Sequence, residues 1–150
     1  MKDRFETFTV LIAKISRNIR RIKNQEMADY DLRSPHISCL YYLYLSEGLT
    51  ATELCERCEE DKATISRSIE YLEGNGYLVG RPKAAKRYKS PLLLTEKGRE
   101  VGKKIADKID LVFDEVSAGL TEEERVSFYR VLNMISSGLE AISNRLDERE

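Results

Sequence analysis

The stretch of sequence that decides the fold runs from Thr50 to Thr95 and reads TATELCERCEEDKATISRSIEYLEGNGYLVGRPKAAKRYKSPLLLT. Two short helical patterns come first, and the turn Gly74-Asn75-Gly76 ends the second of them. A short apolar strand follows, then a basic segment, then a second apolar strand that ends at Thr95. The order helix, turn, helix and hairpin is typical of a winged unit that places one helix in a DNA groove and the hairpin on the flanking backbone.

The second of these helices has one buried and one polar side. Asp61 is predicted to cap it, and Ile65, Ile69 and Leu72 form an apolar stripe with helical spacing. The side chains around its exposed first turns are small, hydroxyl-bearing or cationic: Lys62, Ala63, Thr64, Ser66 and Arg67. Small residues allow close approach to a major groove, while hydroxyl and guanidinium groups donate to base edges and phosphates.

The distribution of charge, rather than its sum, points to nucleic acid. The formal net charge is −1, but residues 61–94 carry seven Lys/Arg against three Asp/Glu, and no acid occurs between Glu73 and Glu96. A local cationic patch is what gains from phosphate contact and counterion release. The basic residues of the hairpin are Arg81, Lys83, Lys86, Arg87 and Lys89. A soluble hairpin that avoids aggregation through its lysines is the alternative, and the preceding helix pair favours DNA.

Both ends of the chain carry narrow apolar seams on long helices. The first seam consists of Phe5, Phe8, Ile12, Ile15, Ile19 and Ile22, and the second of Phe128, Leu132, Ile135, Leu139, Ile142 and Leu146. Heptad spacing of this kind buries itself against another long helix. We expect the two seams to pack on each other and on their counterparts in a second subunit; packing within one chain is the alternative.

Capping residues predict where the remaining helices begin. Ser34-Pro35 is predicted to begin the helix after the first seam, with Ser34 as its cap. Thr50 or Thr52 is expected to cap the next helix and Thr95 the one after the hairpin. The sequence from Thr121 to Glu124 is a capping box for the last helix.

Taken in order, these residues resemble the MarR family of bacterial winged helix-turn-helix regulators. The strongest match is ATELCERCEEDKATISRSIEYLEGNGYLVGRP, followed by LLLTEKGRE. The resemblance implies a mainly α fold with a small β-wing, spanning residues 1–150 as one domain. Residues 34–95 would form the winged helix-turn-helix unit, and residues 1–33 and 96–150 the terminal helices of an intertwined homodimerisation region. It further implies binding to a pseudo-palindromic operator in double-stranded DNA, most often as a repressor that a small molecule releases.

The resemblance also assigns roles by position. The segment from Asp61 to Ser68 would start the recognition helix, and Arg87 would reach toward the minor groove. Lys86 stands where the family usually has an acid that pairs with this arginine, which adds a cation to the wing. The predicted DNA-contacting residues are Lys62, Thr64, Ser66, Arg67, Ser68, Arg81, Lys83, Lys86, Arg87 and Lys89.

A ligand pocket is the second site that the resemblance implies. Effectors such as phenolic acids bind in this family between the dimer helices and the winged unit. His36, Tyr41 and Tyr44 would line such a pocket here, since an amphipathic ring suits a small aromatic ligand. The alternative is that the tyrosines belong to the core and that His36 is a surface or hydrogen-bonded residue.

Several classes of chemistry find little support in the sequence. Cys55-x-x-Cys58 has no second pair to complete a metal site, and both residues are read as core positions. A reactive Cys39, in a regulator that senses oxidants, is kept as an alternative. With one histidine and no nucleophile or phosphate-loop motif, the sequence predicts no enzyme, metal or cofactor.

The cellular location of the protein is predicted from the absence of certain sequence features. Three cysteines do not make a disulfide framework, and neither a signal peptide nor a membrane-spanning run is recognisable, so we expect a cytoplasmic protein. The rival function is a winged-helix module that binds protein rather than DNA. Such a module would expose apolar residues where this sequence places cations.

Overall fold

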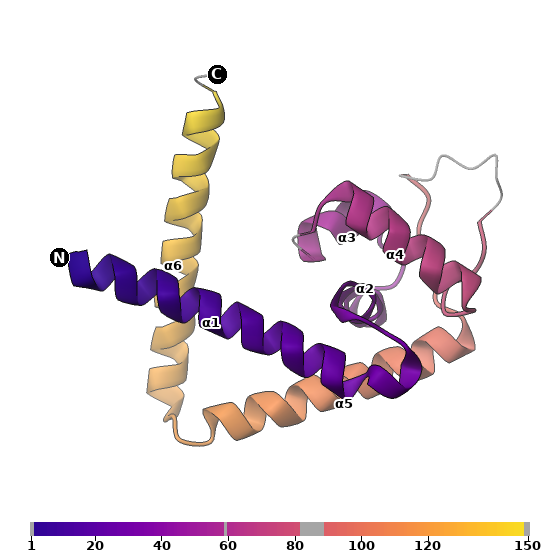
Figure 1. Ribbon diagram of the computed structural model, residues 1–150, viewed down its shortest axis with the longest axis horizontal. Coiled ribbons are helices and arrows are strands. Elements are labelled where there is room, and N and C mark those ends of the chain that lie inside the picture. The colour runs from indigo at the N-terminus through magenta and orange to yellow at the C-terminus, as the bar shows by residue number, and fades with distance from the viewer. Residues whose placement is uncertain (1, 59, 82–88, 149–150) are drawn as a thin grey trace. The chain divides into compact units, whose positions relative to one another are not determined.

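The computed structural model is almost entirely helical. It describes residues 2–58, 60–81 and 89–148. Its elements are α1 (Lys2–Glu26), the short 3-10 helix η1 (Ala28–Tyr30), α2 (Ser34–Leu45), α3 (Ala51–Cys58), α4 (Lys62–Gly74), α5 (Glu96–Ser117) and α6 (Glu122–Asp147), shown in Figure 1. The chain divides into two compact units, residues 1–108 and residues 109–150, and the division falls within α5. The helix order expected for a winged helix-turn-helix chain is confirmed.

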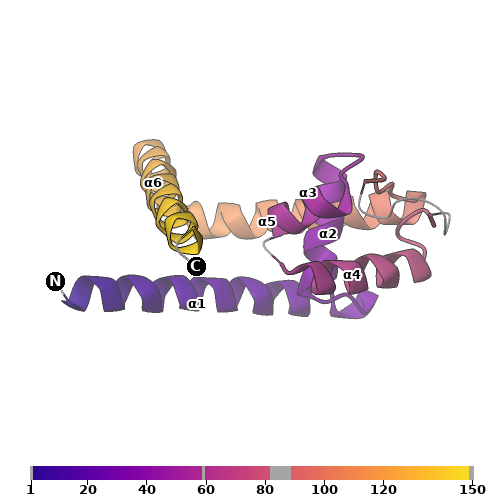
Figure 2. The same ribbon diagram turned by 90° about the horizontal axis from the view of Figure 1, so that it is seen from above.

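The core of the first unit surrounds α2. This helix packs on α3 and α4 on one side, and the first half of α5 lies on its other side (Figures 1 and 2). The predicted stripe Ile65, Ile69 and Leu72 is buried, as is Leu54 of α3. The side chains that are buried most completely are Met27, Leu32, Ile37, Cys39, Leu40, Leu43, Leu54, Ile65, Leu72, Leu92 and Ile105.

Most helix caps form where the sequence predicts them. Thr50 and Glu53 exchange hydrogen bonds at the start of α3, and Thr121 and Glu124 do the same at the start of α6. The prediction for α2 is wrong by one residue. Arg33 is its N-cap, and the Ser34 N–H donates instead to Asn24 Oδ1 of α1 at 2.7 Å.

The base of the wing is held by backbone hydrogen bonds. Leu78 and Leu94 form an antiparallel bridge, and the Val79 N–H donates to the Leu93 carbonyl at 2.9 Å. The Leu92 N–H donates to the carbonyl of Leu49, just before α3, at 2.9 Å. Residues 82–88, which include the expected tip, lie outside the described residues, so the two-stranded wing stays a prediction beyond its base.

The junction between the wing and α5 is unusually close. The Thr95 hydroxyl donates to the Gly76 carbonyl at 2.6 Å and accepts from the Gly98 N–H at 3.0 Å, so it caps α5 and fastens the turn after α4. A Cβ at Gly98 would lie 2.0 Å from the Tyr77 carbonyl oxygen. Gly76, with φ +77, takes the left-handed position of the turn that follows α4.

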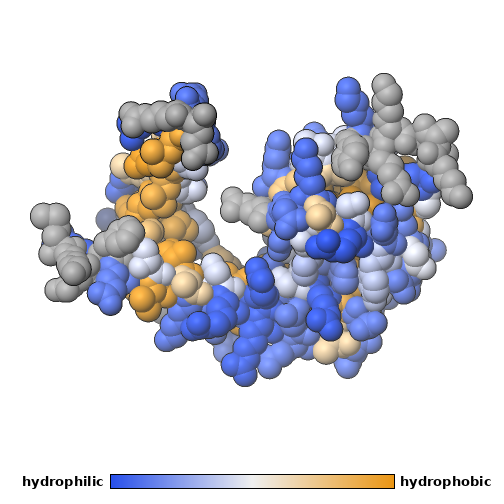
Figure 3. Space-filling view, turned by 45° about the horizontal axis from the view of Figure 1, so that its top comes forward, coloured by the Kyte–Doolittle hydropathy of each residue, from blue (hydrophilic) through white to orange (hydrophobic). Residues whose placement is uncertain are grey.

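The second unit, residues 109–150, exposes apolar side chains along its length. Large apolar residues of α6 remain open to solvent in the single chain, among them Phe128, which is 51% exposed, and Leu139, which is 54% exposed. Figure 3 shows these side chains as a continuous apolar column along α6. Within this unit Phe113 and Tyr129 stack with ring centroids 6.2 Å apart.

The seam of α1 in the first unit is likewise open. Ile12, Ile15, Ile19 and Ile22 are each exposed, while Met27 just beyond the helix is buried. Burying one such side chain contributes about 1.5–3 kcal/mol, so an exposed seam of this length is a surface that favours association. Among the described helices, none is long and apolar enough to cross a membrane.

We predict that Gly98→Ala destabilises the protein by about 1–3 kcal/mol, the usual cost of forcing extra volume into a packed site. The added methyl would meet the Tyr77 backbone, which cannot move without disturbing the base of the wing. Urea unfolding followed by circular dichroism measures the change.

The matched control is Gly74→Ala at the end of α4, where the added Cβ would meet no described atom within 4 Å apart from its chain neighbours and the backbone of its own helix. This variant should be as stable as the natural protein or slightly more stable, because alanine favours helix. Equal stability of the two variants would contradict the close approach at Gly98.

Candidate nucleic-acid interface

The N-terminus of α4 is fixed by Asp61, as the sequence predicts. Its Oδ1 accepts from the Thr64 N–H at 2.7 Å, and its Oδ2 accepts from the Thr64 hydroxyl at 3.1 Å. The hydrogen bond from the Thr64 backbone, followed by that from its hydroxyl, lowers the pKa of the Asp61 carboxyl. The carboxylate therefore stays ionised at neutral pH and stabilises the positive end of the helix dipole.

The first turns of α4 present cations to solvent. Lys62 and Arg67 are exposed, while Thr64 and Ser66 are half-buried between them. The Arg67 guanidinium donates from its Nη2 to the Thr64 hydroxyl at 3.2 Å, which holds it over the first turn. Four of the predicted residues thus share one accessible side of the helix.

Ser68 does not belong to this side: its burial disfavours the predicted DNA contact, which stays a prediction. Its side chain is 3% exposed, and its hydroxyl donates to the Thr64 carbonyl at 2.8 Å. It follows Arg67 by one residue, which turns it toward the buried stripe that contains Ile69. A serine is tolerated there because the carbonyl one turn back satisfies its hydroxyl.

Arg81 is a structural residue in addition to a cation of the wing. Its Nε donates to Glu73 Oε1 at 2.7 Å, and the two side chains are 12% and 17% exposed. This ion pair fastens the start of the wing to the end of α4, and the composition of the sequence alone did not suggest it. Lys89 is exposed on the returning side, while Lys83, Lys86 and Arg87 lie outside the described residues.

A shallow cavity of about 220 Å³ lies between α3, α4 and the wing base. Its lining includes the buried apolar residues Ala51, Ile65 and Ile69 and the cations Lys62 and Arg81. Its remaining lining residues are Thr52, Cys55, Glu56, Ser66 and Glu70.

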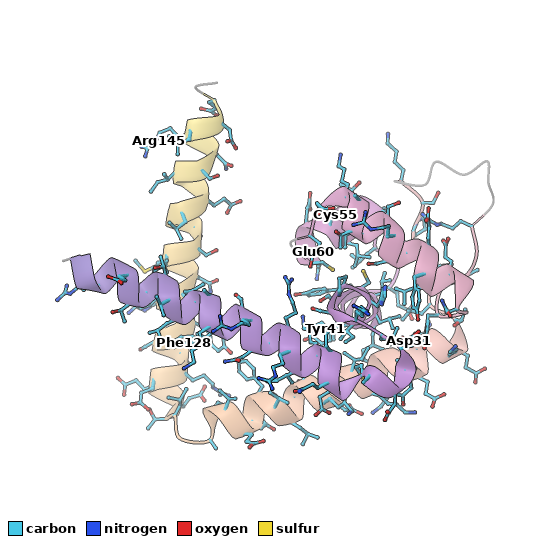
Figure 4. The ribbon with its side chains drawn as sticks, in the orientation of Figure 1. Asp31, Tyr41, Cys55, Glu60, Phe128 and Arg145 are labelled. Carbon is cyan, nitrogen blue, oxygen red and sulfur yellow. The ribbon has the colours of Figure 1, made fainter. Side chains whose placement is uncertain are left out.

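The three residues predicted to line an effector pocket are not brought together in that cavity. His36 stacks on Tyr71 of α4 with ring centroids 4.2 Å apart, and Tyr41, labelled in Figure 4, meets Tyr42 edge to face. Tyr44 packs close to Gly102 of α5, where a Cβ would lie 2.9 Å from the Tyr44 Cβ. Each side chain is half-buried against a different neighbour, and the pocket stays a prediction.

His36 closes the start of α2. Its Nδ1 accepts from the Arg33 N–H at 3.1 Å, so the neutral ring carries its proton on Nε2. Burial, and after it the positive charge of Arg33, lowers the pKa of His36, while Asp31 opposes them. The Tyr71 hydroxyl beside it donates to the Asp31 carbonyl at 2.8 Å.

The helix pair, the capped and cationic α4 and the bridged wing base define a winged helix-turn-helix protein. Residues 30–87 match the sequence model of the MarR family. The HTH-type transcriptional regulator YybA of Bacillus subtilis is 26% identical over 129 residues, which cover 86% of each chain. Over residues 30–87 the chain is therefore similar to the MarR family, and over most of its length it is similar to HTH-type transcriptional regulators.

Solved structures share the fold. A MarR protein from Peptoclostridium difficile superimposes with a TM-score of 0.79 at 21% identity, covering 89% of this chain and 88% of that one. A MarR family regulator from Listeria monocytogenes, solved in complex with 26mer DNA, gives a TM-score of 0.76 at 25% identity over 85% of each chain. The MepR–DNA complex from S. aureus gives 0.77 at 21% identity, covering 88% of this chain and 97% of that one.

The capping role of His36 predicts a pH dependence of stability. Because folding depresses its pKa, the neutral ring stabilises the fold fully above the unfolded pKa of about 6.5. That contribution is lost as the pH falls below this value and through the folded pKa. Stability measured by chemical unfolding should therefore decrease over this range.

His36→Gln should flatten this decrease, since a glutamine at the same helix position keeps an acceptor for the Arg33 N–H but does not titrate. The variant also loses the stack on Tyr71, which changes its stability at every pH. The two proteins are therefore compared by the slope of their stability against pH and not by its absolute value. As His36 is the only histidine, an unchanged slope in the variant would exclude it as the cause.

Proposed function

We propose that the protein binds double-stranded DNA as a homodimer and represses transcription from a pseudo-palindromic operator. Helix α4 would enter the major groove, and the wing would contact the flanking minor groove and backbone. The observation that carries this proposal is the accessible side of α4, where Lys62 and Arg67 flank half-buried hydroxyl groups. Relatives of this fold have been solved with DNA, which supports the same class of ligand here.

The residues of the proposed interface have different roles, which follow from the chemistry of their side chains. Arg67 can donate two parallel hydrogen bonds to a guanine edge, whereas Lys62 offers a point charge suited to a phosphate. Thr64 holds the Arg67 guanidinium in place, which reduces the entropy lost on binding. We assign base contact to Arg67 and positioning on the backbone to Lys62, with Thr64 and Ser66 lining the approach.

The wing would add electrostatic affinity. Lys83, Lys86 and Arg87 are assigned to phosphate and minor-groove contact from the sequence, together with the exposed Lys89. Arg81 supports them through its ion pair to Glu73, which fixes the base from which the wing extends. Each phosphate neutralised in this way steepens the salt dependence of binding.

Dimerisation is proposed for the terminal helices. Residues 1–33 and 96–150 would supply the subunit interface, and residues 34–95 the DNA-binding unit. The supporting observation is that the α1 seam in the first unit and the α6 seam in the second are each exposed in the single chain. A small aromatic effector, with His36, Tyr41 and Tyr44 as its proposed contacts, would then regulate the dimer.

A winged-helix module that binds a protein partner is the alternative function. Such a module needs an apolar patch on its recognition surface, because protein interfaces are depleted in charge at their centres. The accessible start of α4 instead carries Lys62 and Arg67. This composition favours DNA.

We predict that Arg67→Ala weakens operator binding by about 1–3 kcal/mol and relaxes the base preference at one position of each half-site. Fluorescence anisotropy measures affinity, using an operator selected from genomic fragments.

Lys103→Ala is the control for loss of one positive charge, since this exposed lysine of α5 pairs with Asp107 at 2.7 Å. It should leave affinity almost unchanged. If Arg67→Ala bound as tightly as this control, α4 would not read the bases through Arg67.

Leu139→Asp is predicted to yield monomers or unfolded chains, because it places a charge within the apolar seam of α6. Analytical ultracentrifugation reports the mass in solution, and circular dichroism reports helix content. Ser137→Asp adds the same charge to an exposed position outside the seam and should remain dimeric. A stable dimer of the Leu139 variant would overturn the proposed interface.

A further inference from the structure

Three side chains at the start of α4 are joined in a row by hydrogen bonds. The Thr64 hydroxyl donates to Asp61 Oδ2 at 3.1 Å, and Arg67 Nη2 donates to the same hydroxyl oxygen at 3.2 Å. An ionised carboxylate only accepts and a guanidinium only donates, so the single proton of the hydroxyl must point toward Asp61. The hydroxyl oxygen is thereby turned toward Arg67, and the charges at the two ends fix the direction of both bonds.

Asp61 uses its two carboxylate oxygens for two different bonds. Its Oδ1 accepts from the Thr64 N–H at 2.7 Å, which is the ordinary bond of a helix N-cap. The second oxygen is not needed for this purpose, because serine, with one side-chain oxygen, caps a helix about as well as aspartate does. Oδ2 and the negative charge are therefore available to hold the Thr64 hydroxyl and, through it, Arg67.

The two neighbouring acids before α4 interact with different cations. The backbone and then the hydroxyl of Thr64 lower the pKa of the Asp61 carboxyl, and the positive charge of Arg67 acts in the same direction. Glu60, labelled in Figure 4, acts instead on Lys23 of α1. Burial lowers the pKa of Lys23, and the charge of Glu60 opposes that effect. Asp61 is thus the acid of this pair that is coupled to the exposed arginine of α4.

A guanidinium that is held in this way is suited to reading a base. Guanine accepts two parallel N–H bonds, and Thr64 occupies only one of the five N–H donors of Arg67. A freely rotating arginine can also bind phosphates, which carry no sequence information. Holding Arg67 over the first turn of α4 limits that choice, and the carboxylate of Asp61 repels phosphates from the same place.

We propose that Asp61 is a positioning residue for base recognition, which acts through the Thr64 hydroxyl to direct Arg67 toward a guanine in each half-site. This inference rests on the proposed DNA binding and on Arg67 as the residue that contacts a base. The base preference at that position would then depend on a side chain that itself contacts no DNA. Asp61 increases the selectivity of binding, expressed as the ratio of operator affinity to affinity for unrelated DNA.

The first test separates the cap from the row of hydrogen bonds. Asp61→Ser keeps an oxygen for the Thr64 N–H but removes the second oxygen and the charge, so stability in urea should change little. The selectivity ratio should fall about 2- to 10-fold, the equivalent of one hydrogen bond. Part of that fall should come from tighter binding to unrelated DNA. Fluorescence anisotropy measures both affinities, with the selected operator and a scrambled duplex of equal length.

Glu60→Ser is the matched control, because it removes the same charge one residue earlier, outside the row of hydrogen bonds. It should strengthen binding to both duplexes by the same factor and leave the selectivity ratio unchanged. An equal fall in the ratio for the two variants would show that loss of charge alone is responsible, and the positioning role of Asp61 would be overturned.

Variants of Thr64 test the middle of the row. Thr64→Val keeps the branched shape without the hydroxyl and should lose preference for guanine at the base read by Arg67. Thr64→Ser restores a hydroxyl and should retain that preference. Added to Arg67→Ala, Thr64→Val should cause no further loss, because both changes remove the same function. Additive losses would mean that Thr64 contacts DNA independently of Arg67, which would contradict the proposal.

A measurement on the free protein distinguishes failure of this inference from failure of the proposed function. Thr64→Val should raise the pKa of the Asp61 carboxyl, followed by carbon-13 NMR, and should increase the mobility of the Arg67 Nε–H in nitrogen-15 relaxation. If neither changes, the row of hydrogen bonds does not exist in solution and the inference fails alone. If both change but the natural protein binds no operator, the proposed function fails and the role of Asp61 in base recognition fails with it.

Discussion

The hydroxyl of Thr95 is the point on which the winged unit depends. It donates to the Gly76 carbonyl and accepts from the Gly98 N–H, so one side chain joins the turn after α4 to the start of α5. Gly98 makes this possible because a side chain there would collide with the Tyr77 carbonyl. Together with the Leu78–Leu94 bridge, this junction determines where the wing leaves the helical core.

Features governed by neighbours in the chain could be predicted from the sequence. The caps Asp61, Thr95 and Thr121 follow from hydrogen bonds that reach only three residues, and the buried stripe of α4 follows from helical spacing. The prediction that Ser34 caps α2 also considered only neighbouring residues, and it is wrong for that reason. A serine before a proline is a good cap, but the contact between its N–H and Asn24 belongs to tertiary structure.

Features that depend on distant parts of the chain could not be predicted in this way. Ser68 is polar, yet it lies at the edge of the buried side of α4. Its hydroxyl is satisfied there because it donates to the Thr64 carbonyl one turn earlier. The sequence predicts Arg81 only as a cation of the wing, whereas the fold pairs it with Glu73. In each case composition identified the residue but not its partner.

The contact between Tyr71 and Asp31 has a consequence for the order in which the molecule opens. Asp31 has a left-handed backbone, φ 55, and its carbonyl accepts the Tyr71 hydroxyl, while His36 covers the tyrosine ring. The last turns of α4 and the connection from α1 to α2 are thereby held by the same ring. These segments should unfold together as one cooperative unit, with amide hydrogens that exchange at a common rate. Helix α4 would then keep its internal structure for as long as that distant connection stays closed.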